Sequence, residues 1–351
     1  MLSNRFFFGC VSALIAVLFG GIVLLPHALQ RTDVLFPFQG IDILATDAEI
    51  HYAARVREIA DGFWSSGNVY FSAPKNQQSL IPALPELSIV AVARLLHVDP
   101  MTVFIVSKGV MATILAFILI ACFTFITGRP WASLLAVTAL LYAGALLGAP
   151  WDIFSFLSGS VTRYDFLRFA RPINPQWSGT WFFAAVWVLA AWVRRRSLVT
   201  AFLFALLLVI ELYSYVYAWT FLGMTLALLF VWYWFRRDGP RMRDLLCIFA
   251  VFFVLGTPYF IHVNRLVSHP FYADAAQRIG LISSRAPVLG FWSILFPFIA
   301  FASRQRWPAT WPLIMALSLG GLLAINQQVV TGLSLVPHHY YWYFLHPLAS
   351  V

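Results

Sequence analysis

Long apolar runs recur along the whole chain and constrain its fold more than any other feature. Nine are present, at about 9–27, 101–127, 131–150, 179–193, 198–214, 217–235, 244–262, 288–303 and 308–325. About 20 apolar residues in a helix cross a bilayer core. Of the residues, 61% are hydrophobic and only 11% are charged, whereas soluble domains carry roughly a quarter charged residues. The sequence therefore predicts an all-α, polytopic transmembrane helix bundle of about nine spans.

Two stretches need separate interpretation. The first apolar run is too long for the core of a typical signal peptide, and no small-x-small cleavage pattern follows it. We therefore expect a retained first span. The stretch 80–96 contains Glu86, Arg94 and two prolines, so we expect an interfacial or re-entrant helix there instead of a crossing.

Basic residues fall on one side of this predicted topology. If the N-terminus is cytoplasmic, the inner segments hold Arg5, Arg129, Arg194, Arg195, Arg196, Arg236, Arg237, Arg241, Arg243, Arg304 and Arg306. Only Asp238 and Asp244 accompany them, and the outer side holds 12 basic and 12 acidic residues. This distribution follows the positive-inside rule. It predicts a multi-pass protein of the plasma (inner) membrane and gives no support for nucleic-acid binding.

Four polar segments share the outer side of this topology. They are 28–100, 151–178, 263–287 and 326–351. We place any chemistry there, because the inner connections are short and merely basic. The first segment is predicted to be a long loop that carries juxtamembrane amphipathic helices. No P-loop or metalloprotease motif is present in the sequence.

The stretch TDAEIHYAARVREIADG, residues 46–62, predicts a helix in the first loop. Thr46 and Glu49 have the spacing of a capping box, and Gly62 is a plausible stop. An apolar stripe is predicted to lie on the membrane, with a polar stripe facing outward. The apolar stripe contains Tyr52, Val56, Ile59 and Phe63, and the polar stripe contains Asp47, His51, Arg55 and Glu58. The alternative is a purely structural role, in which Asp47 complements the helix dipole and His51 and Arg55 form a solvated face.

The pattern Asp47-x4-Tyr52-x2-Arg55-x3-Ile59-x2-Gly62 resembles the first external loop of the GT-C superfamily of membrane glycosyltransferases. It is similar to the loop of oligosaccharyltransferase catalytic subunits, and one span followed by a long loop and a multi-span bundle fits the same architecture. The resemblance implies a single GT-C-like domain over 1–351. It also implies that Asp47, with Glu49 as a second candidate, is the catalytic or metal-binding acid.

GT-C enzymes move a sugar from a polyprenyl-phosphate carrier to an acceptor on the outer face of the membrane. The resemblance therefore implies a polyprenyl-phosphate-linked sugar, membrane lipids, and a glycan, lipid or protein acceptor as partners. A divalent metal, Mg or Mn, is left open, because Asp47 and Glu49 alone would be a poor cage. The chain has no WWDYG motif, which argues against asparagine glycosylation.

The second outer loop supplies cations for a departing lipid phosphate. Its sequence VTRYDFLRFARPINPQWSG contains Arg163, Arg168 and Arg171, and arginine suits bidentate phosphate contacts. Asn174 and Gln176 add neutral hydrogen-bonding groups. The alternative is a set of interfacial anchors, in which arginines reach the membrane surface beside aromatic residues.

The last outer segment, 326–351, is predicted to contribute His338 and His339, which could contact phosphate or an acceptor. The alternative is an aromatic belt with interfacial histidines. The segment resembles the start of a further helix, so we expect either a fragment or a short member of the superfamily.

A transporter or lipid-carrier flippase is the rival from a different functional class. Intramembrane charge would favour it, but few charges fall within the predicted spans. Lys108 lies near the outer end of its span, where we expect its ammonium to reach the surface. Glu211 is costlier in lipid and predicts a cavity. We find no internal repeat of the kind that transporters show.

Overall fold

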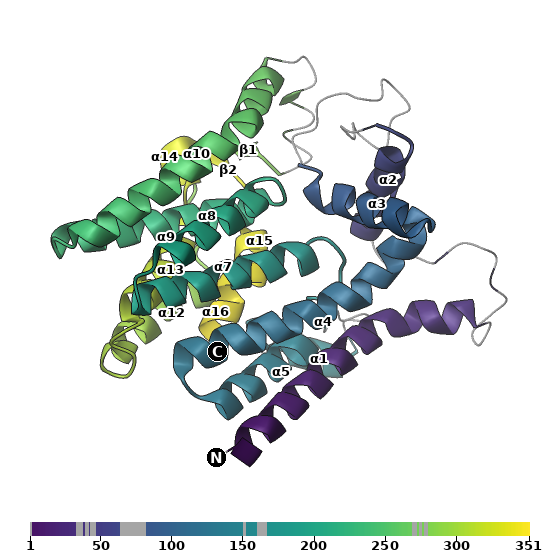
Figure 1. The fold of residues 1–351 in the computed structure, drawn as a ribbon, viewed down its shortest axis with the longest axis horizontal. Coiled ribbons are helices and arrows are strands. Elements are labelled where there is room, and N and C mark those ends of the chain that lie inside the picture. The colour runs from purple at the N-terminus through teal and green to yellow at the C-terminus, as the bar shows by residue number, and fades with distance from the viewer. Residues whose placement is uncertain are drawn as a thin grey trace.

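The computed structural model describes residues 2–32, 38, 42, 47–63, 82–149, 152–159, 167–268, 272–273, 276 and 280–351. Helices account for most of the described chain (Figure 1). They are α1 (Leu2–Arg31), α2 (Asp47–Ala60), α3 (Leu84–Leu96), α4 (Pro100–Thr127), α5 (Pro130–Gly148), α6 (Asp152–Leu157), α7 (Gln176–Arg194), α8 (Leu198–Leu212), α9 (Val216–Phe235), α10 (Gly239–Val267), α12 (Phe291–Ala302), α13 (Trp311–Ile325), α14 (Gln328–Thr331), α15 (Pro337–Tyr340) and α16 (His346–Ser350). A 3-10 turn η1 (Ser303–Gln305), a π-helical turn η2 (Tyr341–Leu345) and a short antiparallel pair, β1 (Ile282–Ser283) with β2 (Leu333–Ser334), complete the elements.

Five helices of the described chain are long and apolar enough to cross a membrane: Asn4–Arg31, Pro100–Thr127, Val216–Phe235, Gly239–Val267 and Trp311–Thr331. They contain five of the nine predicted runs. The other four runs form the shorter or less apolar helices α5, α7, α8 and α12. The backbone leaves helical geometry at Ala143 within α5, and α12 has only 12 residues. The prediction of an all-α integral membrane protein is confirmed at this coarser level.

The helices meet at two ends of the bundle. At one end, the Arg194 guanidinium donates to the Ile126 carbonyl at 3.0 Å and the Trp307 indole donates to the Thr127 carbonyl at 3.1 Å. The eleven arginines predicted for the inner side belong to the turns and helix termini of this end, which we call the arginine end. At the other end, the loop end, the Trp177 indole donates to the Ser214 hydroxyl at 3.0 Å. The described parts of the predicted outer segments therefore lie opposite most of the arginines.

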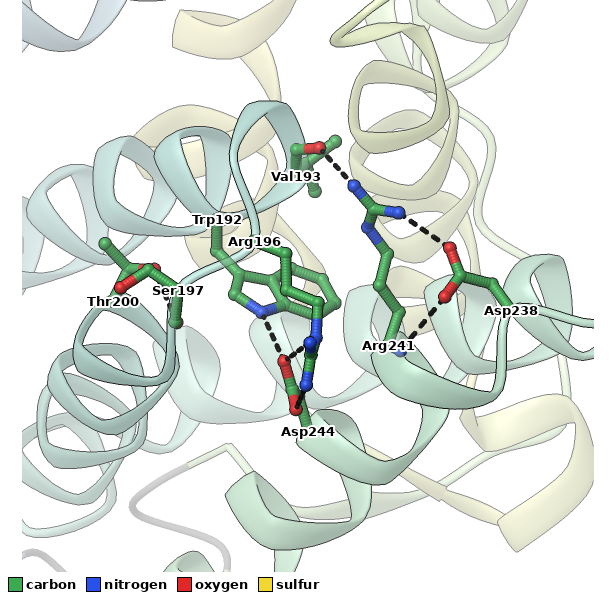
Figure 2. Close-up of polar contacts among 8 residues, drawn as sticks. All are labelled: Trp192, Val193, Arg196, Ser197, Thr200, Asp238, Arg241 and Asp244. Atoms are coloured by element: carbon green, nitrogen blue, oxygen red, sulfur yellow. Dashed lines mark hydrogen bonds and ion pairs between the residues drawn. The ribbon is translucent and has the colours of Figure 1, made fainter.

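Two aspartates hold the helix termini of the arginine end together (Figure 2). Asp244 is 1% exposed and accepts from the Arg196 Nε and Nη2, each at 2.7 Å, and from the Trp192 indole at 3.3 Å. Asp238 caps α10 by accepting from the Arg241 backbone amide at 3.1 Å. It also forms an ion pair with the Arg241 guanidinium at 2.6 Å. Part of the basic charge at this end is thus neutralised within the protein.

Helix α2 begins and ends near the predicted boundaries, but its surroundings differ from the prediction. Val56 and Ile59 pack against Ile89 of α3 and Phe104 of α4, so the apolar stripe is covered by protein. Thr46, the predicted cap, lies outside the described residues. The expected outward polar stripe is wrong for Arg55, which is 1% exposed, and for Glu58, which is 7% exposed. Burial of Arg55 is explained by the ion pair described below.

The terminal segment packs into the bundle and is helical without interruption from α15 through η2 to α16. Phe344 of η2 lies 4.2 Å from Phe182 of α7, measured between ring centroids, and is fully buried. Tyr340 and His346 are each 1% exposed. Figure 1 shows these yellow elements behind α7. This packing brings residues near 340 into the region where the outer loops meet.

Candidate functional site

A buried ion pair joins the first-loop helix to a membrane-spanning helix. The Lys108 ammonium of α4 donates to the Glu49 carboxylate of α2 at 2.8 Å, and both side chains are about 5% exposed. His27 of α1 lies 2.8 Å from the same ammonium through Nε2. The expectation that Lys108 reaches the membrane surface is therefore wrong. An ammonium held by two partners is more stable in the protein interior than one left alone.

A second ion pair lies beside the triad of Glu49, Lys108 and His27, at the C-terminal end of α1. The Arg31 guanidinium donates to both Asp42 oxygens, at 2.9 and 2.6 Å. The Asp42 carboxylate lies 3.9 Å from the His27 Nδ1. The Arg31 guanidinium holds the pKa of Asp42 below its usual value. Charged groups therefore extend from the described part of the first loop into the helices α1 and α4.

Arg55 forms a separate buried pair roughly two turns further along α2 than Glu49. Its Nε lies 2.7 Å from the Glu86 carboxylate of α3, and both side chains are 1% exposed. Its Nη2 donates to the Pro82 carbonyl at 2.9 Å. Arg55 was predicted to bind substrate, but here its guanidinium holds α2 against α3.

A tyrosine–arginine cluster lies at the loop end. We define it as Tyr52, Arg171, Asn174, Tyr215, His339 and Tyr343. The Asn174 amide donates to the Tyr52 hydroxyl at 3.0 Å, and the Arg171 Nη2 donates to the Tyr343 hydroxyl at 2.7 Å. The Tyr215 hydroxyl and the His339 Nδ1 share a hydrogen bond of 2.6 Å. The first of these pairs joins residues that are 122 positions apart in the chain, and the second joins residues that are 172 positions apart.

The guanidinium of Arg171 is held rigidly within this cluster. Its Nε donates to the Asn174 carbonyl, and its Cζ lies 5.4 Å from the Tyr343 ring centroid. The Arg168 Cζ lies 4.3 Å over the Trp342 ring. Exposed His338 stacks edge-on against His339, with ring centroids 5.0 Å apart. Two guanidiniums and two imidazoles therefore occupy neighbouring positions around one group of tyrosines.

The remaining predicted site residues are not members of the tyrosine–arginine cluster. Gln176 is fully buried, and its amide donates to the Ala170 carbonyl at 3.0 Å, so it stabilises the turn before α7. His51 is partly buried, with its ring centroid 5.8 Å from that of Tyr52. Asp47 is the first residue of α2. Arg163 and the side chain of Asp47 lie outside the described residues.

The tyrosines are the part of the site that sequence reasoning missed. Tyr215 and Tyr217 lie in the segment ELYSYVYAW, and Tyr343 lies in PHHYYWYF. The first segment places its tyrosines at a helix break, since α8 ends at Leu212 and α9 begins at Val216. The second runs into the π-helical turn η2. Tyrosines at a break between apolar helices are a signal that could have identified the cluster, because a buried hydroxyl needs a hydrogen-bond partner.

The metal that the resemblance left open does not fit Glu49. A cation already lies at its carboxylate, because the Lys108 ammonium is 2.8 Å away. Among the described residues, no group of three or more His, Cys, Asp or Glu side chains gathers in a metal-binding arrangement. The Glu49 carboxylate therefore pairs with an ammonium where a metal ion would have to bind.

A groove of about 420 Å³ also lies at the loop end, but it is separate from the cluster. It is lined by the end of α2, by α3 and by the start of α4, and includes Arg94 and His97. None of the cluster residues lines it.

The stability of the loop end should depend on pH through its histidines. Burial, followed by the charges of His338 and Arg171, lowers the pKa of His339 to about 3. Burial and the Arg55 charge lower the pKa of His51 to about 4. Below about pH 6.5 the unfolded chain then binds more protons than the folded one, so the free energy of unfolding decreases as the pH falls. Each histidine contributes at most about 1.4 kcal/mol per pH unit to this decrease.

The measurement is thermal unfolding in detergent between about pH 7.5 and about pH 5. His339→Gln keeps an acceptor for the Tyr215 hydroxyl and cannot titrate, so we expect a shallower loss of stability on acidification. Equal pH dependence of the variant and the unmodified protein would contradict this assignment.

Comparison with known proteins finds no matching family model, no matching curated protein and no matching solved structure.

Proposed function

We propose that this protein is a membrane glycosyltransferase that moves a sugar from a polyprenyl-phosphate carrier to a glycan, lipid or protein acceptor. The observation that carries the proposal is the tyrosine–arginine cluster, to which the first loop, the second loop and the terminal segment all contribute side chains. Its members suit a phosphorylated sugar, because guanidiniums bind phosphate and hydroxyl, amide and imidazole groups bind sugar hydroxyls. The resemblance of the first loop to GT-C enzymes is the second support.

The topology that goes with this function has about nine membrane crossings and a cytoplasmic N-terminus. The arginine end then lies on the cytoplasmic side and the cluster on the outer side of the plasma (inner) membrane. The positive-inside distribution supports this orientation. Segments α5, α7, α8 and α12 would complete the crossings together with the five long helices.

The reaction needs a base, an acceptor and a stabilised leaving group. The acceptor oxygen attacks the anomeric carbon, and the bond from that carbon to the phosphate oxygen breaks with its electron pair leaving on the lipid phosphate. Asp47 takes the acceptor proton. Arg168 and Arg171 stabilise the negative charge of the departing phosphate, and the bonds of Arg171 to Tyr343 and to the Asn174 carbonyl hold its guanidinium in place. Exposed His338 would make a further contact to phosphate or acceptor.

The test is a reconstitution of the full chain in vesicles with labelled polyprenyl-phosphate sugars and a panel of acceptors. We expect sugar transfer, and we expect Asp47→Asn to lower the turnover by about a hundredfold. Asp61→Asn is the matched control, because Asp61 is an exposed acid that directly follows the C-terminal end of α2, whereas Asp47 begins the helix. Turnover that Asp47→Asn leaves unchanged would remove Asp47 from catalysis, and no transfer with any lipid-linked sugar would contradict the function.

A transporter or lipid-carrier flippase is the second candidate. The buried triad of Glu49, Lys108 and His27 favours it, because charged residues within membrane-spanning helices often belong to transport pathways. The same vesicles distinguish the two candidates. Movement of the labelled lipid between leaflets without transfer of its sugar would support the transporter.

A further inference from the structure

The arginines of the arginine end fall into two groups. Arg196 and Arg241 form ion pairs with Asp244 and Asp238, as Figure 2 shows. Arg194 donates to a backbone carbonyl. In contrast, Arg5, Arg129, Arg195, Arg236, Arg237, Arg243, Arg304 and Arg306 are exposed. Within the part of the chain that the structure describes, none of these eight forms an ion pair with an acidic side chain.

Three of the exposed arginines flank a connected set of tryptophans. The Trp232 and Trp311 rings lie 5.3 Å apart, which joins the end of α9 to the start of α13. The indole of Trp311 donates to the Ala300 carbonyl at 2.9 Å, and that of Trp307 donates to the Thr127 carbonyl at 3.1 Å. We call this surface the tryptophan–arginine face. It consists of Trp232, Arg236, Arg304, Arg306, Trp307 and Trp311.

Each arginine of the face is placed against an aromatic ring. The Cζ of Arg236 lies 5.8 Å from the Trp232 ring centroid, and that of Arg306 lies 5.9 Å from the Trp307 ring centroid. The Arg304 Cζ lies 5.0 Å from the Phe301 ring centroid. These contacts order the side chains, and all three arginines are exposed to a headgroup.

We propose that the tryptophan–arginine face binds the phosphate headgroups of anionic phospholipids in the leaflet at the arginine end. Exposed apolar side chains adjoin this face, including Phe235 and Phe301, which are 78% and 54% exposed. Acyl chains would cover these residues while the headgroup lies at the arginines. Indoles favour the boundary between headgroups and hydrocarbon. The excess of positive charge is complementary to an anionic leaflet.

The test is native mass spectrometry of the full-length protein with phosphatidylglycerol and phosphatidylcholine of identical acyl chains. We expect the unmodified protein to retain phosphatidylglycerol preferentially. The triple variant Arg236→Gln/Arg304→Gln/Arg306→Gln should reduce that preference at least about tenfold, since each arginine at a membrane surface contributes to anionic-lipid binding. The three side chains are exposed, so the variant is expected to fold.

Two controls separate this face from other effects of charge. Arg57→Gln/Arg94→Gln/Arg265→Gln removes the same charge from exposed positions nearer the loop end and should keep the preference. Arg196→Gln removes a paired arginine and should lower the melting temperature without changing lipid preference. Equal losses of preference in both triple variants would overturn the proposal, as would full preference in the first.

Discussion

Replacing Lys108 with methionine is expected to lower the free energy of unfolding by about 3–5 kcal/mol. The change leaves the Glu49 carboxylate buried without the ammonium that lies 2.8 Å from it. His27 also loses its 2.8 Å contact with that ammonium. Methionine has a similar length and an unbranched, flexible side chain, so the loss of packing is small. The expected cost is therefore mainly electrostatic.

The measurement is chemical or thermal unfolding of the purified protein in detergent. The double variant Glu49→Gln/Lys108→Met removes both charges of this pair and should recover most of the lost stability, because the buried carboxylate is then replaced by a neutral amide. If the double variant were as unstable as Lys108→Met alone, the stranded carboxylate would not be the cause. The single variant would then report packing around residue 108.

Arg55→Met is the second change with a large expected effect. The Arg55 guanidinium and the Glu86 carboxylate are both 1% exposed, so loss of the arginine strands a buried acid and should cost about 3–5 kcal/mol. Two residues along the same helix, Arg57 pairs with Asp61, but these side chains are 62% and 47% exposed. Arg57→Met is therefore the matched control, with an expected cost of at most about 0.5 kcal/mol.

The pH dependence of the free energy of unfolding of Arg55→Met tests whether the loss comes from Glu86. Burial raises the pKa of Glu86, and the charge of Arg55 opposes that rise. Without Arg55 the pKa of Glu86 in the folded state should lie further above its unfolded value. The folded variant then binds more protons than the unfolded chain, so its free energy of unfolding should increase as the pH falls. A cost of Arg55→Met that stays constant from neutral to mildly acidic pH would contradict this explanation.

The sequence was sufficient to predict most helices but not what covers them. Amphipathic periodicity identified α2 because it depends on residues three and four apart. It could not predict that Arg55 and Glu49 are buried, since Glu86 and Lys108 lie in later helices and Lys108 is 59 residues away from Glu49. An isolated helix pattern shows that one face is polar. It does not show whether water or an opposite charge lies against that face.

The candidate site was predicted in its charged residues and missed in its neutral ones. Arg171, Asn174 and His339 attracted attention because cations, amides and imidazoles are uncommon in an apolar chain. Tyr215 and Tyr343 are counted as aromatic residues, and a sequence alone does not separate membrane anchors from hydrogen-bonded hydroxyls. Their partners come from distant segments, as in the contact of Tyr343 with Arg171, 172 residues away. Only the folded chain brings them together.

Apart from α1, the elements that pack against helix α2 are synthesised after it. Its partners Glu86, Lys108 and Asn174 follow it in the chain, and the last of them emerges more than a hundred residues later. During membrane insertion, Arg55 and Glu49 must therefore remain hydrated until α3 and α4 arrive. Tyr52 gains its partner Asn174 only when the segment before α7 has been made, so α2 cannot complete its contacts before that point.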